Sequence, residues 1–141
     1  RIEEGMPALA MGGGTLLLLS KVQDTLGRTS ELAGVIPADG ESLWDLDEAA
    51  HVGVVAERDN LLLAKGETAT GWVLTDAEVT APGARWDTPL LVGSDGEPGG
   101  RSEGICTSSL FCSMVLVHLA ARAGIAPRFV RQCAAFAARP Q

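Results

Sequence analysis

An uncharged, apolar stretch near the C-terminus constrains the fold of this chain more than any other feature. Residues 104–121, within EGICTSSLFCSMVLVHLAARAG, are 18 consecutive residues without a formal charge. This length reaches the lower limit for crossing a bilayer, but four Thr or Ser residues and His118 make insertion costly. We therefore expect a buried helix over residues 107–123 and no membrane span.

Several short apolar runs, each bounded by glycine or other turn residues, indicate strands. Flat apolar runs of this kind are typical of strands buried on both faces, as in parallel sheets. The runs are 16–19, 51–56, 70–76 and 88–96.

Segments with helical spacing lie around these runs. Residues 2–11 and 21–36 predict helices, and 125–139 predicts a final helix with Pro127 in its first turn, where proline is tolerated. Strands that alternate with helices predict one α/β domain over residues 1–141, a layered and mostly parallel sheet flanked by helices.

The middle of the chain leaves an alternative open. The segment ERDN could begin a helix, or it could be a turn between antiparallel strands at 52–56 and 61–64. If residues 51–80 form an antiparallel meander, the class becomes α+β.

The charge distribution bears on possible partners. The formal net charge is −7 and aromatic residues make up 4% of the chain, which disfavours binding to phosphate backbones or stacking on bases. All acidic residues lie at or before Glu103, and four arginines follow it. A basic C-terminal helix beside an acidic body explains this asymmetry, and a dedicated anion or partner surface is the alternative. We expect a homo-oligomer with no nucleic-acid partner.

The cysteines bear on the compartment. Cys106, Cys112 and Cys133 are an odd number without a dense disulfide pattern, and free cysteine in an apolar stretch behaves as a small hydrophobe. This usage predicts a cytoplasmic protein. The chain begins at Arg1 without a visible signal peptide, so a trimmed product or a fragment is also compatible with it.

The strongest candidate for a binding site is the glycine-rich SDGEPGGRSEG and the hydroxyls that follow it. Thr107, Ser108 and Ser109 would occupy the cap and first turn of the expected helix, where unpaired N–H groups and the helix dipole favour an anion. Serine and threonine are also the ordinary caps of any helix. The segment is not a P-loop, because no lysine follows the glycines. We expect an anionic small molecule here, and no cofactor.

Two segments resemble a known family. GICTSSLFCSMVLVHLAARAG is similar to the last core helix of the SIS (sugar isomerase) family of phosphosugar-binding domains, and GGGTLLLLSKVQDTLGRTSELAG is a looser match to its first strand and helix. The resemblance implies a parallel, nucleotide-binding-like sheet, usually in a dimer, that holds sugar phosphates with the hydroxyls of Ser20, Thr107 and Ser108. The family's Ser-x-Ser/Thr loop should fall near residues 56–60, where this chain has AERDN.

Metal and nucleophile sites find less support. Cys106, Cys112 and His118 are spaced six residues apart, which on a helix turns them away from a shared face, so we expect no metal site. His51 or His118 could serve a nucleophile, but H-E-x-x-H, G-x-S-x-G and G-x-G-x-x-G are absent, so catalytic residues stay unassigned. The function predicted is binding of an anionic ligand such as a sugar phosphate, in an isomerase-like or regulatory domain. The alternative is a non-catalytic structural or oligomerisation subunit.

Overall fold

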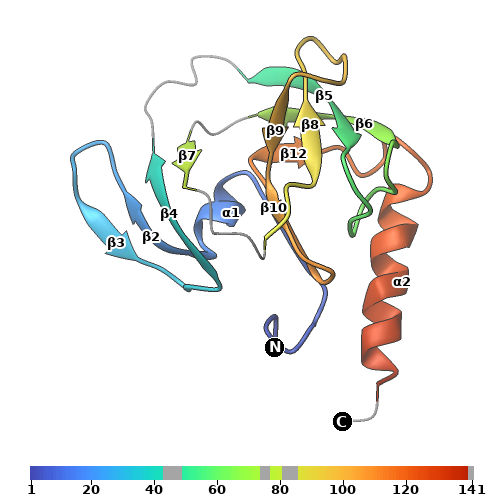
Figure 1. Ribbon diagram of the computed structural model, residues 1–141, viewed down its shortest axis with the longest axis horizontal. Helices are drawn as coiled ribbons and strands as arrows, with labels where there is room; N and C mark the ends of the chain where they lie inside the picture. Colours follow the sequence, from blue (N-terminus) through green and yellow to red (C-terminus); the bar gives the residue numbers. More distant parts are fainter. Residues whose placement is uncertain (43–48, 74–76, 81–85, 140–141) are drawn as a thin grey trace.

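The computed structural model describes residues 1–42, 49–73, 77–80 and 86–139. These residues form three β-sheets and a helix that runs down one side of the molecule to the C-terminus (Figure 1). The helices are α1 (Gly13–Leu16) and α2 (Ile125–Ala137). The strands are β1 (Ala8–Met11), β2 (Leu19–Gln23), β3 (Thr29–Glu31), β4 (Ile36–Ser42), β5 (Ala50–Ala56), β6 (Thr68–Val73), β7 (Ala77–Val79), β8 (Leu90–Val92), β9 (Arg101–Glu103), β10 (Ile105–Cys106), β11 (Leu110–Ser113) and β12 (Val115–Val117).

Two of the three sheets are joined by strand segments that follow one another directly in the sequence. The strand orders of the three sheets are β1-β11-β10, β12-β6-β5-β8-β9 and β3-β2-β4-β7. β11 continues through Met114 into β12, and β9 continues through Gly104 into β10, so both segments pass from one sheet to another. Among the described pairings, β1–β11 and β2–β4 are parallel and the others are antiparallel.

The small sheet β1-β11-β10 separates two hydrophobic cores, because its side chains alternate between its faces. Phe111 is fully buried in the first core, while its neighbours Leu110 and Cys112 are buried in the second. The first core also holds Val52, Val54, Leu61, Leu62, Leu63, Leu90, Val115 and Ile125, and the second holds Leu19, Ile36, Ala38 and Ile105. The small sheet β1-β11-β10 is therefore covered on both faces.

The expected α/β class with a mostly parallel sheet is wrong. The segment predicted as a helix at 107–123 contains the turn after β10, then β11 and β12, whose residues are mostly buried. A strand covered on both faces shows no alternation of apolar and polar residues, so its sequence resembles that of a buried helix. This also corrects the expectation of an SIS-like phosphosugar-binding domain, because the implied last core helix and parallel sheet are replaced by mainly antiparallel strands.

The N-terminal third also differs from prediction. Residues 2–11 form a turn and β1 instead of a helix, and the run 16–19 is the end of α1 and the start of β2. The helix expected at 21–36 is a hairpin of β2 and β3 followed by the start of β4. The Asp24 carboxylate accepts the N–H groups of Leu26 and Arg28, which fixes the hairpin turn where a helix would have continued.

Other elements agree with prediction. The run 51–56 lies in β5, and the final helix is α2, with Pro127 in its first turn. The runs 70–76 and 88–96 contain parts of β6 and β8, although 74–76 lie outside the described residues. Residues 61–64 form a loop between β5 and β6 and no strand. Within the described ranges, no helix has both the length and the apolar character needed to cross a membrane.

Candidate functional site

The predicted ligand-binding hydroxyls lie in a hairpin turn between β10 and β11. The N–H of Thr107 donates to the carbonyl of Leu110 at 2.9 Å and closes the turn. The Thr107 hydroxyl oxygen accepts the N–H groups of Ser109 at 3.3 Å and Leu110 at 3.1 Å. Since this segment is not a helix start, it offers no helix dipole, and two of its amides are already used by Thr107.

A cavity of about 260 Å³ opens beside this turn. Thr107 and Ser109 contribute to its lining, as do Trp86 and the acidic residue Glu3. The rest of the lining is aliphatic: Ile2, Val35 and Leu110. The lining thus combines hydroxyls with a carboxylate and carries no basic side chain, so it does not complement an anion.

The other two predicted ligand residues do not line this cavity. Ser20 lies on β2, and its hydroxyl donates to the carbonyl of Ile36 at 3.3 Å. Ser108 is exposed at the tip of the turn. The structure therefore brings together Thr107 and Ser109, and places Ser20 and Ser108 elsewhere.

The turn between β1 and α1 has a geometry found at many catalytic nucleophiles. In a nucleophile elbow, a strand ends in a sharp, strained residue that presents its side chain just before a helix. Here β1 ends at Met11, and Gly12 adopts φ 56° and ψ −136° immediately before α1. That backbone conformation strongly favours glycine. The position at which an elbow would hold a nucleophile therefore carries no side chain.

Leu116 lies against this empty position. A Cβ atom added to Gly12 would meet three carbons of the Leu116 side chain at 3.6–3.8 Å. A nucleophile in such a turn needs a neighbouring base to activate it, and an aliphatic side chain cannot accept a proton. As it stands, the turn can pack but cannot perform nucleophilic chemistry.

A buried hydrogen-bond network holds the turn in place. The carbonyl of Ser113 accepts the N–H of Gly12 at 2.8 Å and the hydroxyl of Thr15 at 2.9 Å. The Ser113 hydroxyl donates to the Glu103 carboxylate at 2.5 Å, and the N–H of Met114 donates to the other carboxylate oxygen at 2.7 Å. Burial raises the pKa of the Glu103 carboxyl, and the bonds from Ser113 and Met114 partly oppose this shift. Glu103 thus fixes the point where β11 passes into β12.

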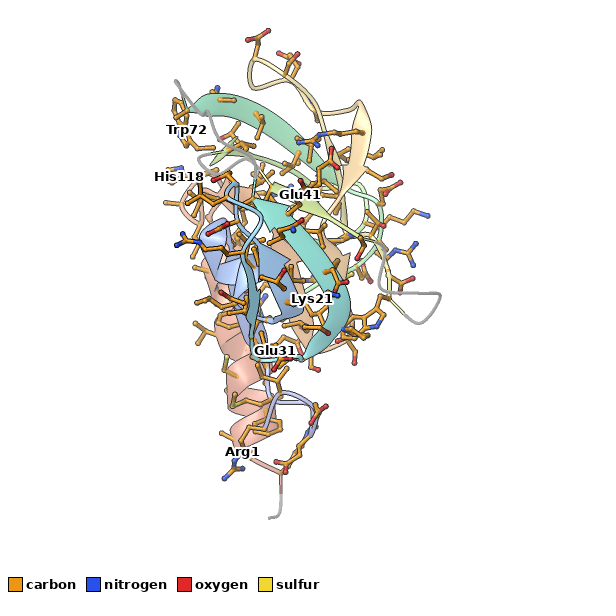
Figure 2. The ribbon with its side chains drawn as sticks, turned by 90° about the vertical axis from the view of Figure 1, so that its left-hand side faces the viewer. Arg1, Lys21, Glu31, Glu41, Trp72 and His118 are labelled. Carbon is orange, nitrogen blue, oxygen red and sulfur yellow. The ribbon has the colours of Figure 1, made fainter. Side chains whose placement is uncertain are left out.

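A row of side chains crosses the five-stranded sheet next to the Gly12 turn. The strand register places Leu116 beside Trp72 and Trp72 beside His51. The rings of His51 and Trp72 have centroids 4.9 Å apart, and Trp72 is 46% exposed. Figure 2 shows Trp72 and His118 toward one end of the molecule and Arg1 near the other. Trp72 and His51 lie at the surface and are not enclosed in a cleft with a nucleophile.

The cysteines are free, and two of them are buried. Register pairs Cys106 with Phe111 and Cys112 with Ile105, so the two buried thiols point to opposite faces of the sheet. Burial raises the pKa of Cys106 to about 11 and that of Cys112 to about 12, which keeps both thiols protonated. Among the described residues, no group of three or more His, Cys, Asp or Glu side chains is placed to hold a metal ion.

Sequence reasoning missed both the Gly12 turn and the buried Glu103. The glycines at 12–14 predict the boundary before a strand at 16–19, whereas in the structure strand β1 precedes them and helix α1 begins within them. Apolar ALAM directly before three glycines and Thr15 is a usable signal for a strand–turn–helix unit. Nothing local in the sequence marks Glu103, because its partners lie ten and eleven residues further on.

Comparison with known proteins gives a partial similarity. No family model matches the chain. A 71-residue part is 35% identical to cobyrinate a,c-diamide synthase from Halobacterium salinarum, and the match covers 50% of this chain and 16% of that protein. The similarity therefore concerns one segment of a much longer enzyme.

Proposed function

We propose that this chain is a non-catalytic subunit that acts by assembling with other protein chains. The observation that carries the proposal is the turn at Gly12: it has the backbone of a nucleophile elbow, yet glycine stands at its tip and Leu116 fills the space beside it. A turn that keeps this geometry without a nucleophile or a base supports a structural role for the segment.

The partial match suggests what kind of assembly the chain serves. The relative's name describes an enzyme that makes cobyrinate a,c-diamide. We propose that this chain belongs beside an enzyme of that kind and does not itself form the amides. A direct test incubates the purified chain with cobyrinate, an ammonium salt, ATP and Mg²⁺, so that both the nitrogen and the means of activating the carboxylates are supplied, and follows the amides by mass spectrometry. We expect no amide to form, and amide formation by the wild-type chain would overturn the proposal.

A variant that supplies a nucleophile at residue 12 tests whether the Gly12 turn has the geometry of a nucleophile elbow. In a Cys133→Ser background, Gly12→Cys supplies a thiol, and Leu116→His places a base against it. The strained φ/ψ at this position makes the first change cost about 1–3 kcal/mol. We expect the thiol to react with iodoacetamide faster, and to titrate at a lower pH, when both changes are present than with Gly12→Cys alone.

The two remaining native cysteines do not interfere with this experiment. Cys106 and Cys112 are buried with pKa values of about 11 and about 12, so they contribute little reactivity at neutral pH. If Leu116→His leaves the reactivity of the new thiol unchanged, the turn does not present side chains as an elbow does, and the main support for the proposal is lost.

The cavity beside Thr107 favours binding of a small molecule as a second candidate function. Two hydroxyl-bearing residues and an aromatic residue line it, as small-molecule sites require, but the Glu3 carboxylate disfavours an anion. A thermal-shift experiment with inorganic phosphate tests the anionic ligand. If the cavity takes anions, phosphate raises Tm, Glu3→Gln increases the rise, and Thr107→Val removes it. An unchanged Tm in all three proteins excludes phosphate as the ligand.

The compartment is also a proposal. Three free cysteines, two of them held apart on opposite faces of one sheet, support a reducing compartment such as the cytoplasm. Thiol labelling of the protein immediately after gentle lysis of the native cells tests this. Oxidised cysteines at that point would argue against it.

A further inference from the structure

β1 is an edge strand whose outer side is open. In the sheet order β1-β11-β10, β1 pairs with β11 alone. The N–H groups of Ala8 and Gly12 donate to carbonyls of the β11 segment, at Ser109 and Ser113. Because backbone groups alternate along a strand, those of Leu9 and Met11 point away from β11. No hydrogen bond engages these outward groups in the part of the chain that the structure describes.

The composition of β1 is that of an interior strand. Its four residues, ALAM, are all apolar, with Leu9 and Met11 packed against the first core and Ala8 and Ala10 against the second. A strand covered on both faces and parallel to its neighbour normally lies inside a sheet. An uncharged, proline-free edge of this kind is one that proteins usually cover.

The other described edges are shorter than β1, charged or covered. β10, at the opposite edge of the same sheet, is covered by a bridge in which Asp87 and Cys106 exchange two backbone hydrogen bonds of 3.1 and 2.7 Å. β9 and β3 are three-residue strands that carry charged side chains. β12 and β7 are three-residue edge strands; β7 carries Glu78, and in the uncharged β12 the N–H of Val115 donates to the Ser113 hydroxyl at 3.0 Å. Short or charged edges discourage further pairing. The contrast singles out β1 as the edge available for an added strand.

The space around β1 allows a strand to approach. β1 leads directly into the glycines at the start of α1, and a Cβ added to Gly13 or Gly14 would meet nothing within 4 Å. Leu17, just after α1, is an apolar side chain that is 61% exposed. An approaching backbone therefore meets an open, apolar flank at the C-terminal end of β1.

We propose that β1 pairs with β1 of a second copy of this chain, antiparallel across a two-fold axis near Ala10. This pairing is self-complementary: Leu9 then lies opposite Met11 of the partner subunit, and each such pair exchanges both of its N–H···O bonds. The pairing joins two small sheets into one, and the paired segment ALAM itself carries no charged side chain. Two-fold dimers are also the commonest assembly. The inference rests on the proposed assembly role and adds a second copy of this chain as a partner.

The test uses a proline that removes only an outward donor. Leu9→Pro deletes the outward N–H of residue 9 and leaves the bonds to β11 in place, while Leu9→Ala makes a similar loss of packing but keeps the N–H. We expect size-exclusion chromatography with light scattering to give the wild type twice the 14.6 kDa chain mass. Leu9→Ala should keep a dimer at high concentration, and Leu9→Pro should be monomeric. A wild type that is monomeric at every concentration, or a Leu9→Pro variant as dimeric as Leu9→Ala, overturns the inference.

Hydrogen exchange of the wild type keeps the inference testable if Leu9→Pro does not fold. The amides of Leu9 and Met11 should exchange slowly in concentrated protein and faster on dilution, while those of Ala8 and Ala10 stay protected at both concentrations. Outward amides that exchange rapidly at all concentrations overturn the pairing. The two proposals fail separately, because a monomeric chain refutes the β1 dimer, whereas amide formation by the wild type refutes the non-catalytic role.

Discussion

Asn60 organises the loop between β5 and β6 and offers the sharpest test of how this fold is held. Its side chain is buried, and its carboxamide oxygen accepts the N–H groups of Leu62 and Leu63, both at 2.9 Å. Its own carbonyl accepts the Arg128 guanidinium N–H from α2 at 2.8 Å. One residue therefore fixes a loop of buried leucines and the helix that packs beside it.

Asn60→Ala should destabilise the protein strongly. The change leaves two buried backbone donors without an acceptor, and each unsatisfied buried group costs about 1–3 kcal/mol. The expected loss in free energy of unfolding is therefore about 2–6 kcal/mol, a large share of the total for a domain of this size. Urea denaturation measures this loss, and Tm should fall on the order of 10 °C.

Asn60→Asp is the matched control. Aspartate keeps an oxygen in place for both amides and loses only the donor to the Arg58 carbonyl, a long bond of 3.3 Å. We expect it to lose less than half the stability that Asn60→Ala loses. If the two variants are equally destabilised, the acceptor role is wrong and the cost of replacing Asn60 comes from packing alone.

Three further predictions address packing, ionisation and thiol exposure. Gly71→Ala should cost about 1–3 kcal/mol, because the added Cβ would lie 2.6 Å from a carbonyl oxygen of β12; Gly13→Ala, which meets nothing within 4 Å, should leave the urea midpoint unchanged or raised. Burial raises the pKa of Glu103 above its ordinary value of 4.5, so the folded state binds the carboxyl proton more tightly than the unfolded state does. The stability of the protein should therefore increase as pH falls through the raised pKa toward 4.5, and this contribution should be lost as pH rises. Urea titrations at several pH values should show that Glu103→Gln flattens this part of the profile, and an unaltered profile would contradict the assignment. At neutral pH a maleimide should label Cys133 well before the two buried cysteines, as counted by mass spectrometry of the native protein, and rapid triple labelling would contradict their burial.

The sequence predicts α2 and β5 better than the small sheet β1-β11-β10. α2 was predictable because Pro127 sits in its first turn and its apolar residues recur at helical spacing, and β5 because a valine-rich run stands between turn residues. β11 was not predictable in the same way, since all four of its residues are buried and leave no alternation to read. Together, β11 and β12 form an apolar stretch that is long enough to be predicted as a buried helix.

The local geometry of the predicted binding site differs from the expectation for the same reason. The sequence predicts Thr107, Ser108 and Ser109 at a helix start because the apolar stretch after them has the length of a buried helix. In a hairpin, the Thr107 oxygen instead accepts two amides of its own turn. The neighbourhood of Thr107 is still concave, but this depends on Glu3 and Trp86, which lie far from it in the sequence. Local spacing carries no information on such contacts.

The network around Ser113 explains how the Gly12 turn can persist without chemistry. Thr15 and Gly12 both bond to the Ser113 carbonyl, across 98 residues of sequence in the case of Thr15, and Glu103 holds the Ser113 hydroxyl from the other side. These bonds tie β1 to the point where β11 passes into β12, so they stabilise both cores whether or not residue 12 has a side chain. The same bonds hold β1 by its inner side alone. Because these bonds to Ser113 all lie on the inner side of β1, its outer side stays open, and this sheet can be extended there.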